Sequence, residues 1–244
     1  MRFIKETKGI GCKLIQFIIN NGLYLILAVA TAFAYLWISQ FKEKLRIKEW
    51  MALVIAILHT LVGVLCVKLF AFLESGSGGM SLYGAVFFLP VLYYASAKLT
   101  KRSTADVFDV FTICTAMTLM FSRFNCLIAG CCTGLIIPGT DAFRFPTREA
   151  EILFYIVLYL VLRKKVCKKE YNGKIYPYYM ISYGTFRFIT EFFRESEMQY
   201  GWFHISHIWS VLAIAIGVTA ICLINKNKNE NKQFSKKKTK RRGS

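Results

Sequence analysis

The sequence is dominated by apolar stretches that are long enough to cross a lipid bilayer. A helix needs about 20 apolar residues to span a hydrocarbon core of about 30 Å. Seven segments approach that length: Leu23–Gln40, Met51–Leu73, Met80–Leu99, Val107–Ala129, Ala150–Leu162, Tyr176–Phe193 and Ile205–Ile224. The chain is therefore predicted to be an all-α, polytopic membrane protein with seven transmembrane helices.

The composition excludes other classes of protein. Hydrophobic residues make up 55% of the 244 residues and charged residues only 19%, which leaves too little polar surface for a water-soluble domain. The eight cysteines are sparse for a disulfide scaffold of this length. A membrane-embedded bundle is the class that remains.

The distribution of Lys and Arg between the loops predicts the orientation. The segments 41–50, 98–102, 163–175 and 225–244 together carry 22 basic residues, whereas the segments on the opposite side carry 7. The positive-inside rule places the richer set in the cytoplasm. We therefore expect the N-terminus outside and the C-terminus in the cytoplasm, although four basic residues in Met1–Gly22 run against this bias.

The C-terminal segment 225–244 differs from the rest of the chain because it is strongly basic. It holds nine basic residues and one acidic residue, so we divide the chain into a transmembrane domain, residues 1–224, and a disordered cytoplasmic tail, residues 225–244. Such a tail is attracted to an anionic membrane surface. Nucleic-acid binding is the minor alternative, because the tail has a single aromatic residue and no stacking platform; no nucleic-acid partner is expected.

Ionisable residues inside the sixth span are the first indication of a functional site. Each such group costs about 2.5–3.5 kcal/mol to insert, so it usually faces a cavity or a partner. Arg187, Glu191 and Arg194 follow one another at spacings that place them on one face of a helix. Guanidinium groups in this arrangement suit a phosphate or carboxylate ligand. The alternative is an internal ion-pair network that only fixes helix packing.

A second candidate site surrounds Arg123 at the end of the fourth span. Gly130 and Gly134 follow, and glycines allow close approach of the backbone to a ligand or a helix. Arg123 with nearby backbone N–H groups would form an anion site at the outer face. Glu151 either faces Arg123 across a cavity or is simply an acid favoured near a helix N-terminus.

Cys126, Cys131 and Cys132 lie in the same segment. Two of them are adjacent and no histidine lies nearby in sequence, so the spacing is poor for zinc. We expect structural small residues first, a disulfide or a reactive thiol second, and a metal site last. No metal ligand is predicted.

These residues resemble the motifs of the prolipoprotein diacylglyceryl transferase family, seven-span enzymes of the bacterial plasma membrane. The resemblance runs from about Gly76 to Gly217, and its strongest part is Tyr183-Gly-Thr-Phe-Arg-Phe-Ile-Thr-Glu-Phe-Phe-Arg-Glu195. The segments from Ser122 to Gly134, from Pro146 to Glu151 and from Gly79 to Gly84 are similar to three further family motifs in the same order. Matching positions are Arg123, Glu151, Tyr183, Arg187, Glu191 and Arg194.

The resemblance implies transfer of diacylglyceryl from phosphatidylglycerol to the lipobox cysteine thiol of a prolipoprotein signal peptide, with release of glycerol phosphate. It implies that Arg123 holds the phosphate and stabilises the leaving group, and that Arg187, positioned by Glu191, clamps the headgroup. Arg194, Tyr183 and Gly134 would complete the substrate site. No metal, nucleotide or other cofactor is required.

The sequence departs from the family where a base is needed. Tyr83 occupies the position of the family's histidine, and Cys126, Ala129 and Cys131 replace two asparagines and a glutamate. Either the pKa of Tyr83 is lowered by the arginines, Glu151 takes the thiol proton, or the reaction differs. A transferase with another thiol or hydroxyl acceptor and a non-catalytic lipid-binding protein both stay open.

Overall fold

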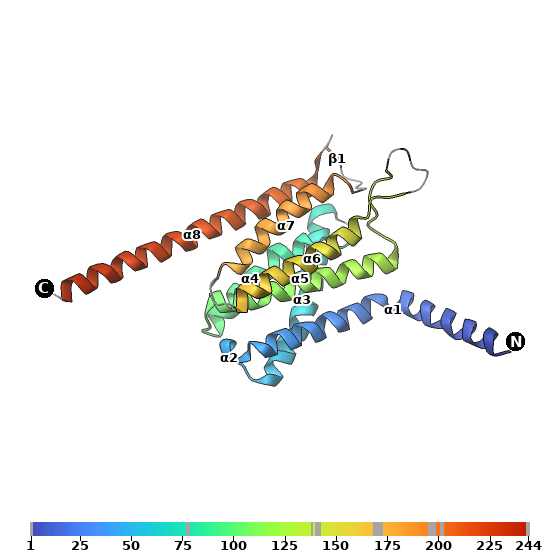
Figure 1. Ribbon diagram of the computed structural model, residues 1–244, viewed down its shortest axis with the longest axis horizontal. Helices are drawn as coiled ribbons and strands as arrows, with labels where there is room; N and C mark the ends of the chain where they lie inside the picture. The colour runs from blue at the N-terminus through green and yellow to red at the C-terminus, as the bar shows by residue number, and fades with distance from the viewer. Residues whose placement is uncertain are drawn as a thin grey trace.

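The computed structural model of the protein describes residues 2–76, 79–137, 139, 143–167, 173–194, 199–200 and 203–242, with side chains within residues 21–226. The elements are α1 (Arg2–Gln40), α2 (Lys42–Leu45), α3 (Glu49–Ser75), α4 (Tyr83–Leu99), α5 (Thr104–Ala129), α6 (Thr147–Cys167), α7 (Ile175–Glu191), β1 (Gln199–Tyr200), β2 (Phe203–His204) and α8 (Ile205–Arg242). Figure 1 shows the helices gathered into one bundle, with the distal parts of α1 and α8 extending from opposite ends.

Each of the seven predicted spans coincides with one long helix. Within the described part of the chain, four helical segments are long and apolar enough to cross a membrane: Asn21–Gln40, Glu49–Glu74, Thr104–Ala129 and Ile205–Lys226. The chain is thus a helical, polytopic membrane protein. Helices α4 and α7 have 17 residues each, and α6 has charged residues near both ends, so crossing by all seven stays a prediction.

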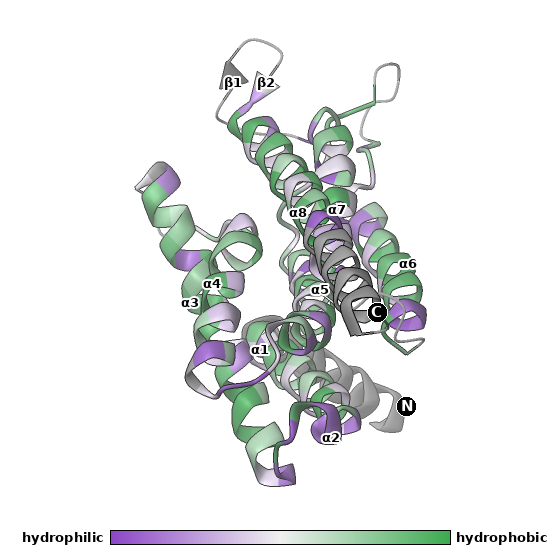
Figure 2. Ribbon diagram, turned by 90° about the vertical axis from the view of Figure 1, so that its left-hand side faces the viewer, coloured by the Kyte–Doolittle hydropathy of each residue, from purple (hydrophilic) through white to green (hydrophobic). Residues whose placement is uncertain are grey.

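Helix α5 is the centre of the bundle. It packs against α1, α4, α6 and α7, while α7 and α8 lie side by side and α3 lies along α4 (Figure 2). The Ser103 side chain caps its start by accepting a hydrogen bond from the Asp106 amide, and Gly130 ends it in a left-handed conformation with φ 68°. Two-thirds of its apolar window is buried in the protein.

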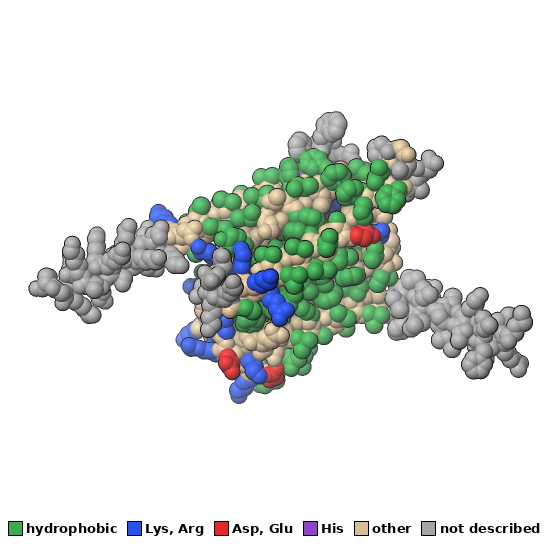
Figure 3. All heavy atoms as spheres, viewed as in Figure 1, with side chains coloured by type: hydrophobic (Ala, Val, Ile, Leu, Met, Phe, Trp, Pro, Cys, Tyr) green, Lys and Arg blue, Asp and Glu red, His purple; other side chains and the backbone are tan. Residues whose placement is uncertain are grey.

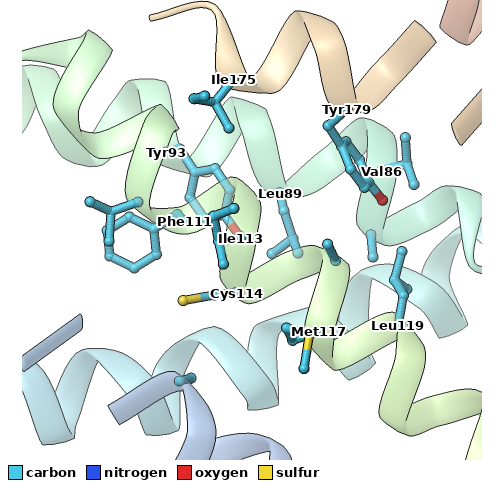
Figure 4. Close-up of a cluster of buried hydrophobic side chains, with 14 of the residues drawn as sticks. Val86, Leu89, Tyr93, Phe111, Ile113, Cys114, Met117, Leu119, Ile175 and Tyr179 are labelled. Atoms are coloured by element: carbon cyan, nitrogen blue, oxygen red, sulfur yellow. The ribbon is translucent and has the colours of Figure 1, made fainter. Parts of the chain in front are cut away.

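The core between α4, α5 and α7 is built mainly from apolar side chains, as Figure 4 shows for Leu89, Ile113 and Tyr179. One polar cluster lies within it: the Tyr93 hydroxyl is 2.9 Å from His59 Nδ1 and 2.9 Å from Thr115 Oγ1. These contacts supply hydrogen-bond partners to the buried Tyr93 hydroxyl and to Nδ1 of His59. His59 is therefore a packed core residue.

The face of the bundle seen in Figure 3 is mainly apolar along its middle, and basic residues gather at one end. Figure 3 shows hydrophobic side chains over the body of the bundle and Lys and Arg concentrated beside α2. Leu61 and Leu65 on α3 are 60% and 64% exposed, values typical of a face that contacts lipid tails rather than water.

The remaining elements lie beyond α7. The strands β1 and β2 form a small antiparallel hairpin, a minor exception to the all-α prediction. Helix α8 continues to Arg242, so the backbone of residues 225–242 is helical where a disordered tail was expected. The separate tail and its attraction to the membrane stay predictions.

Candidate functional site

Four buried charged side chains form a continuous chain of ion pairs between α5, α6 and α7. Arg123 Nε pairs with Glu151 Oε2, Arg187 Nη1 donates to Glu151 Oε1 at 2.7 Å, and Arg187 Nη2 donates to Glu191 Oε2 at 3.0 Å. All four residues are only 2% to 3% exposed. The network has two positive and two negative groups, and Glu151 links its two arginines.

The positions of these residues in their helices bring them to one end of the bundle. Arg123 lies near the end of α5, Glu151 near the start of α6, and Arg187 and Glu191 in the last turns of α7. Because the loop from α5 to α6 returns the chain antiparallel, the end of α5 and the start of α6 meet. Removing one partner of such a buried pair typically costs about 3–5 kcal/mol, so the network fixes how the three helices pack.

Several buried donors beside the network have no hydrogen-bond partner among the described residues. They are Arg187 Nε and the hydroxyl groups of Tyr155 and Tyr183. Both tyrosines are 0% exposed, and each lies close enough to Arg187 and Glu151 to interact electrostatically with them. Buried polar groups are normally paired, so these donors around one guanidinium are available to hydrogen-bond to the oxygens of an anion.

Tyr83 presents its ring, rather than its hydroxyl group, to this site. The guanidinium of Arg187 lies over the Tyr83 ring at 5.6 Å from the centroid. The hydroxyl group is bonded elsewhere, to the Ser206 carbonyl at 2.9 Å and to Ser210 Oγ at 2.8 Å on α8. This arrangement makes Tyr83 a cation–π platform for Arg187.

The prediction that Arg187, Glu191 and Arg194 share one helical face is wrong for Arg194. Helix α7 ends at Glu191, and the backbone of Arg194 instead forms a β-bridge with Gly134. The helical spacing of charged residues continues to Arg194 in the sequence, but the segment that contains Arg194 pairs with the α5–α6 loop, and the helix ends before it. Arg194 is half-buried, lies within electrostatic reach of Glu151 and makes no ion pair with a described carboxylate.

Gly134 serves close packing of the backbone. A side chain at this position would collide with the carbonyl oxygen of Phe145, and the Phe145 ring stacks on Phe193 at 4.5 Å. The glycine therefore allows the loop to pass between Phe145 and Arg194, and so helps to position that arginine. Its predicted role in binding substrate stays a prediction.

The three cysteines of the signature segment meet beside Arg123. Their sulfur atoms all lie within 4.8 Å of one another, and Arg123 Nη1 is 3.9 Å from Cys126 Sγ. The hydrogen bond from the Cys126 thiol lowers the pKa of the Cys132 thiol well below its usual value, and the guanidinium of Arg194 acts in the same direction. The sequence placed these cysteines in one segment but did not predict that all three would meet.

Tyr155 is the site residue that the sequence analysis missed. It lies four residues after Glu151 on α6, so both project from one helical face. An aromatic residue in an apolar span is by itself no indication of a functional site. Its spacing from a buried glutamate was the signal that could have identified it.

Comparison with known proteins shows to which family the sequence is similar. Residues 15–223 match the model of the prolipoprotein diacylglyceryl transferase family. Proteins named phosphatidylglycerol–prolipoprotein diacylglyceryl transferase are similar to the chain: that of Rickettsia typhi is 30% identical over 63% of this chain and 66% of its own length. The protein of Chlorobaculum tepidum is 29% identical over 64% of this chain and 59% of its own length. The protein of Campylobacter lari is 31% identical over 59% of this chain and 57% of its own length.

The matched region thus spans about three-fifths of the length of these relatives. The family model covers most of the chain, including all four residues of the ion-pair network. The chain belongs to the prolipoprotein diacylglyceryl transferase family.

Proposed function

We propose that the protein transfers a diacylglyceryl group from phosphatidylglycerol to the lipobox cysteine thiol of a prolipoprotein signal peptide. The observation that carries this proposal is the buried network at the ends of α5, α6 and α7. Its guanidinium groups lie among unpartnered donors in a mainly apolar bundle. Family membership supports the same reaction.

The donors around Arg187 suit a phosphodiester. Arg187 Nε, the Tyr155 hydroxyl and the Tyr183 hydroxyl would donate to phosphate oxygens. Arg194, half-buried at the rim, adds a guanidinium that no described carboxylate neutralises. The surrounding apolar residues strengthen these interactions because water is excluded.

The reaction exchanges one bond to carbon for another. The acceptor sulfur attacks the glyceryl carbon that carries the phosphate, a carbon–sulfur bond forms, and the carbon–oxygen bond to phosphate breaks. Glycerol phosphate leaves with both bonding electrons, and its added negative charge develops next to Arg123 and Arg187. Donors fixed beforehand at that position stabilise the transition state more than the bound substrate.

Glu151 is our candidate for the group that takes the thiol proton. In the network it pairs with both Arg123 and Arg187. A phosphate bound to those guanidiniums would weaken their hold on the carboxylate and leave an oxygen able to accept the proton. Tyr83 is less suited, because its hydroxyl group already donates to the Ser206 carbonyl.

The proposed setting is the bacterial plasma membrane, crossed seven times, with the N-terminus outside and the C-terminus in the cytoplasm. The clustering of Lys and Arg beside α2 supports this orientation, because that end would face the cytoplasm (Figure 3). The network then lies in the outer half of the membrane, where a secreted prolipoprotein presents its cysteine. The basic C-terminal segment would contact anionic lipid on the inner side.

A transfer assay with purified protein tests the proposal. The full chain is reconstituted in phosphatidylglycerol nanodiscs and given a lipobox peptide, and mass spectrometry measures the diacylglyceryl mass added to the peptide. We expect transfer by the wild type, a loss of at least about 100-fold in Arg187→Lys, and wild-type transfer in Arg163→Lys, a matched change of an exposed arginine on α6.

Transfer to a serine-containing peptide only would instead support a different acceptor. Retention of phosphatidylglycerol without transfer to either peptide would overturn the enzymatic proposal and support a lipid-binding protein.

A further inference from the structure

A cluster of three thiols lies at the mouth of the charged network and has no role in the proposed reaction. Cys126 is in the last turn of α5, and Cys131 and Cys132 follow the left-handed turn at Gly130. That turn folds the chain back over the helix end, and the Cys131 amide donates to the Cys126 carbonyl oxygen at 3.2 Å. All three sulfurs consequently lie within 4.8 Å of one another.

We propose that Cys126, Cys131 and Cys132 form a binding site for a thiophilic divalent cation such as Zn²⁺, with the fourth coordination position left for an exogenous ligand. The site goes beyond the proposed transfer reaction and does not depend on it.

The separations of the sulfur atoms support this site. Zinc–sulfur bonds of about 2.3 Å in tetrahedral geometry hold sulfur atoms about 3.8 Å apart. The observed upper limit of 4.8 Å is within about 1 Å of that value, a difference that side-chain rotation at three cysteines can remove. The described residues provide no fourth His, Cys, Asp or Glu ligand in the group, and three protein ligands with one open position are typical of reactive zinc sites.

The charges around the cluster also suit a metal–thiolate centre. A divalent cation bound by three thiolates has a net negative charge. Arg123 Nη1, 3.9 Å from Cys126 Sγ, would offset this charge, and Arg194 lies within electrostatic reach of Cys132.

Groups other than the sulfurs help to hold the backbone that carries the thiols. The Thr147 hydroxyl donates to the Cys132 carbonyl oxygen at 3.1 Å, and Arg148 Nη1 donates to the Cys131 carbonyl oxygen at 3.5 Å. Outer contacts of this kind orient ligands while leaving them available to a metal. An outer-face disulfide is the competing outcome, but it would use only two of the three sulfurs.

Cobalt binding tests the site without reference to catalysis. The full chain is purified in detergent under reducing, anaerobic conditions, stripped of metal with a chelator and titrated with Co²⁺. We expect one Co²⁺ per chain, thiolate-to-cobalt charge-transfer absorption, and displacement of the cobalt by Zn²⁺.

Single substitutions assign the ligands. Cys126→Ser, Cys131→Ser and Cys132→Ser should each weaken binding by more than about 100-fold, beyond the loss typical of outer contacts. Cys167→Ser, at the far end of α6, should bind cobalt like the wild type. Elution as a single detergent-solubilised species establishes that each variant is folded.

Two results would overturn the proposal. One is the absence of charge-transfer absorption in wild-type protein whose three thiols all react with an alkylating agent. The other is a thiol count showing two of the three cysteines oxidised in protein purified without reductant, with no metal bound after reduction.

Discussion

The two ends of α5 each bury an ionisable side chain, but they satisfy it in different ways. Asp109, near the start of the helix, accepts hydrogen bonds from the amides of Gly173 at 3.0 Å and 3.1 Å and of Ile175 at 3.4 Å. Arg123, near the other end, belongs to the ion-pair network with Glu151. Asp109 and Arg123 are 2% and 3% exposed, so burial does not distinguish them.

What distinguishes the two ends is whether any donor is left without a partner. The Asp109 carboxylate takes up backbone N–H groups that the start of α7 would otherwise leave unpaired, which joins α5 to α7. At the other end, Arg187 Nε and two tyrosine hydroxyls have no partner among the described residues. The hydrogen bonds of Asp109 join two helices, whereas the unpartnered donors around Arg187 suit an anionic ligand.

The largest expected effect is on the carboxylate that links the two arginines. Glu151→Gln should lower the free energy of unfolding by about 3–5 kcal/mol, because Arg123 and Arg187 would be left buried without their shared counter-charge. Thermal or denaturant unfolding in detergent measures this change. Glu149→Gln, two residues earlier and half-exposed, should change stability by less than about 0.5 kcal/mol. Equal stabilities of the two variants would contradict the account of the network.

A smaller effect is expected at the opposite end of α5. Asp109→Asn should lower the free energy of unfolding by about 1–3 kcal/mol, because one acceptor for the Gly173 and Ile175 amides is lost. Diacylglyceryl transfer per folded molecule should stay at the wild-type level. A strong loss of transfer with unchanged stability would remove the distinction between the two ends.

The smallest effects on stability are expected from removing tyrosine hydroxyls. Two such changes separate a hydroxyl that serves the fold from one that is available to a ligand. Tyr155→Phe removes an unpartnered hydroxyl, so stability should not fall, but transfer at limiting phosphatidylglycerol should drop about 10-fold, the value of one hydrogen bond to a charged group. Tyr93→Phe removes a hydroxyl bonded to His59 and Thr115. It should cost about 1 kcal/mol of stability and leave transfer unchanged. The reverse pattern in the two variants would count against a ligand site at Tyr155.

The sequence predicted features that depend on local patterns. Apolar runs located every long helix, and the four-residue spacing of Arg187 and Glu191 predicted that they share one helical face, where the structure places their ion pair. One of two alternatives placed Glu151 opposite Arg123 across a cavity; the structure places the two side chains opposite one another but in a direct ion pair. Each of these rests on helix periodicity or on the cost of a charge in a membrane.

Features that depend on distant segments were beyond such reasoning. The end of α7 at Glu191 results from pairing of residues 193–194 with residues 134–135, which no local pattern encodes. The meeting of Cys126 with Cys131 and Cys132 depends on the left-handed turn at Gly130 and on contacts from α6. The hydrogen bonds of the Tyr83 hydroxyl group to Ser206 and Ser210 on α8 connect residues that are more than 120 positions apart in the sequence.

The central claim is that Arg187 and its neighbours hold an anionic lipid headgroup, and lipid retention measures this most directly. Native mass spectrometry of the protein, purified from nanodiscs with equal amounts of phosphatidylglycerol and phosphatidylethanolamine, reports which lipid stays bound. The account predicts a preference for phosphatidylglycerol in the wild type and in Asp109→Asn, and its loss in Arg187→Lys. The same preference in all three proteins would contradict the account.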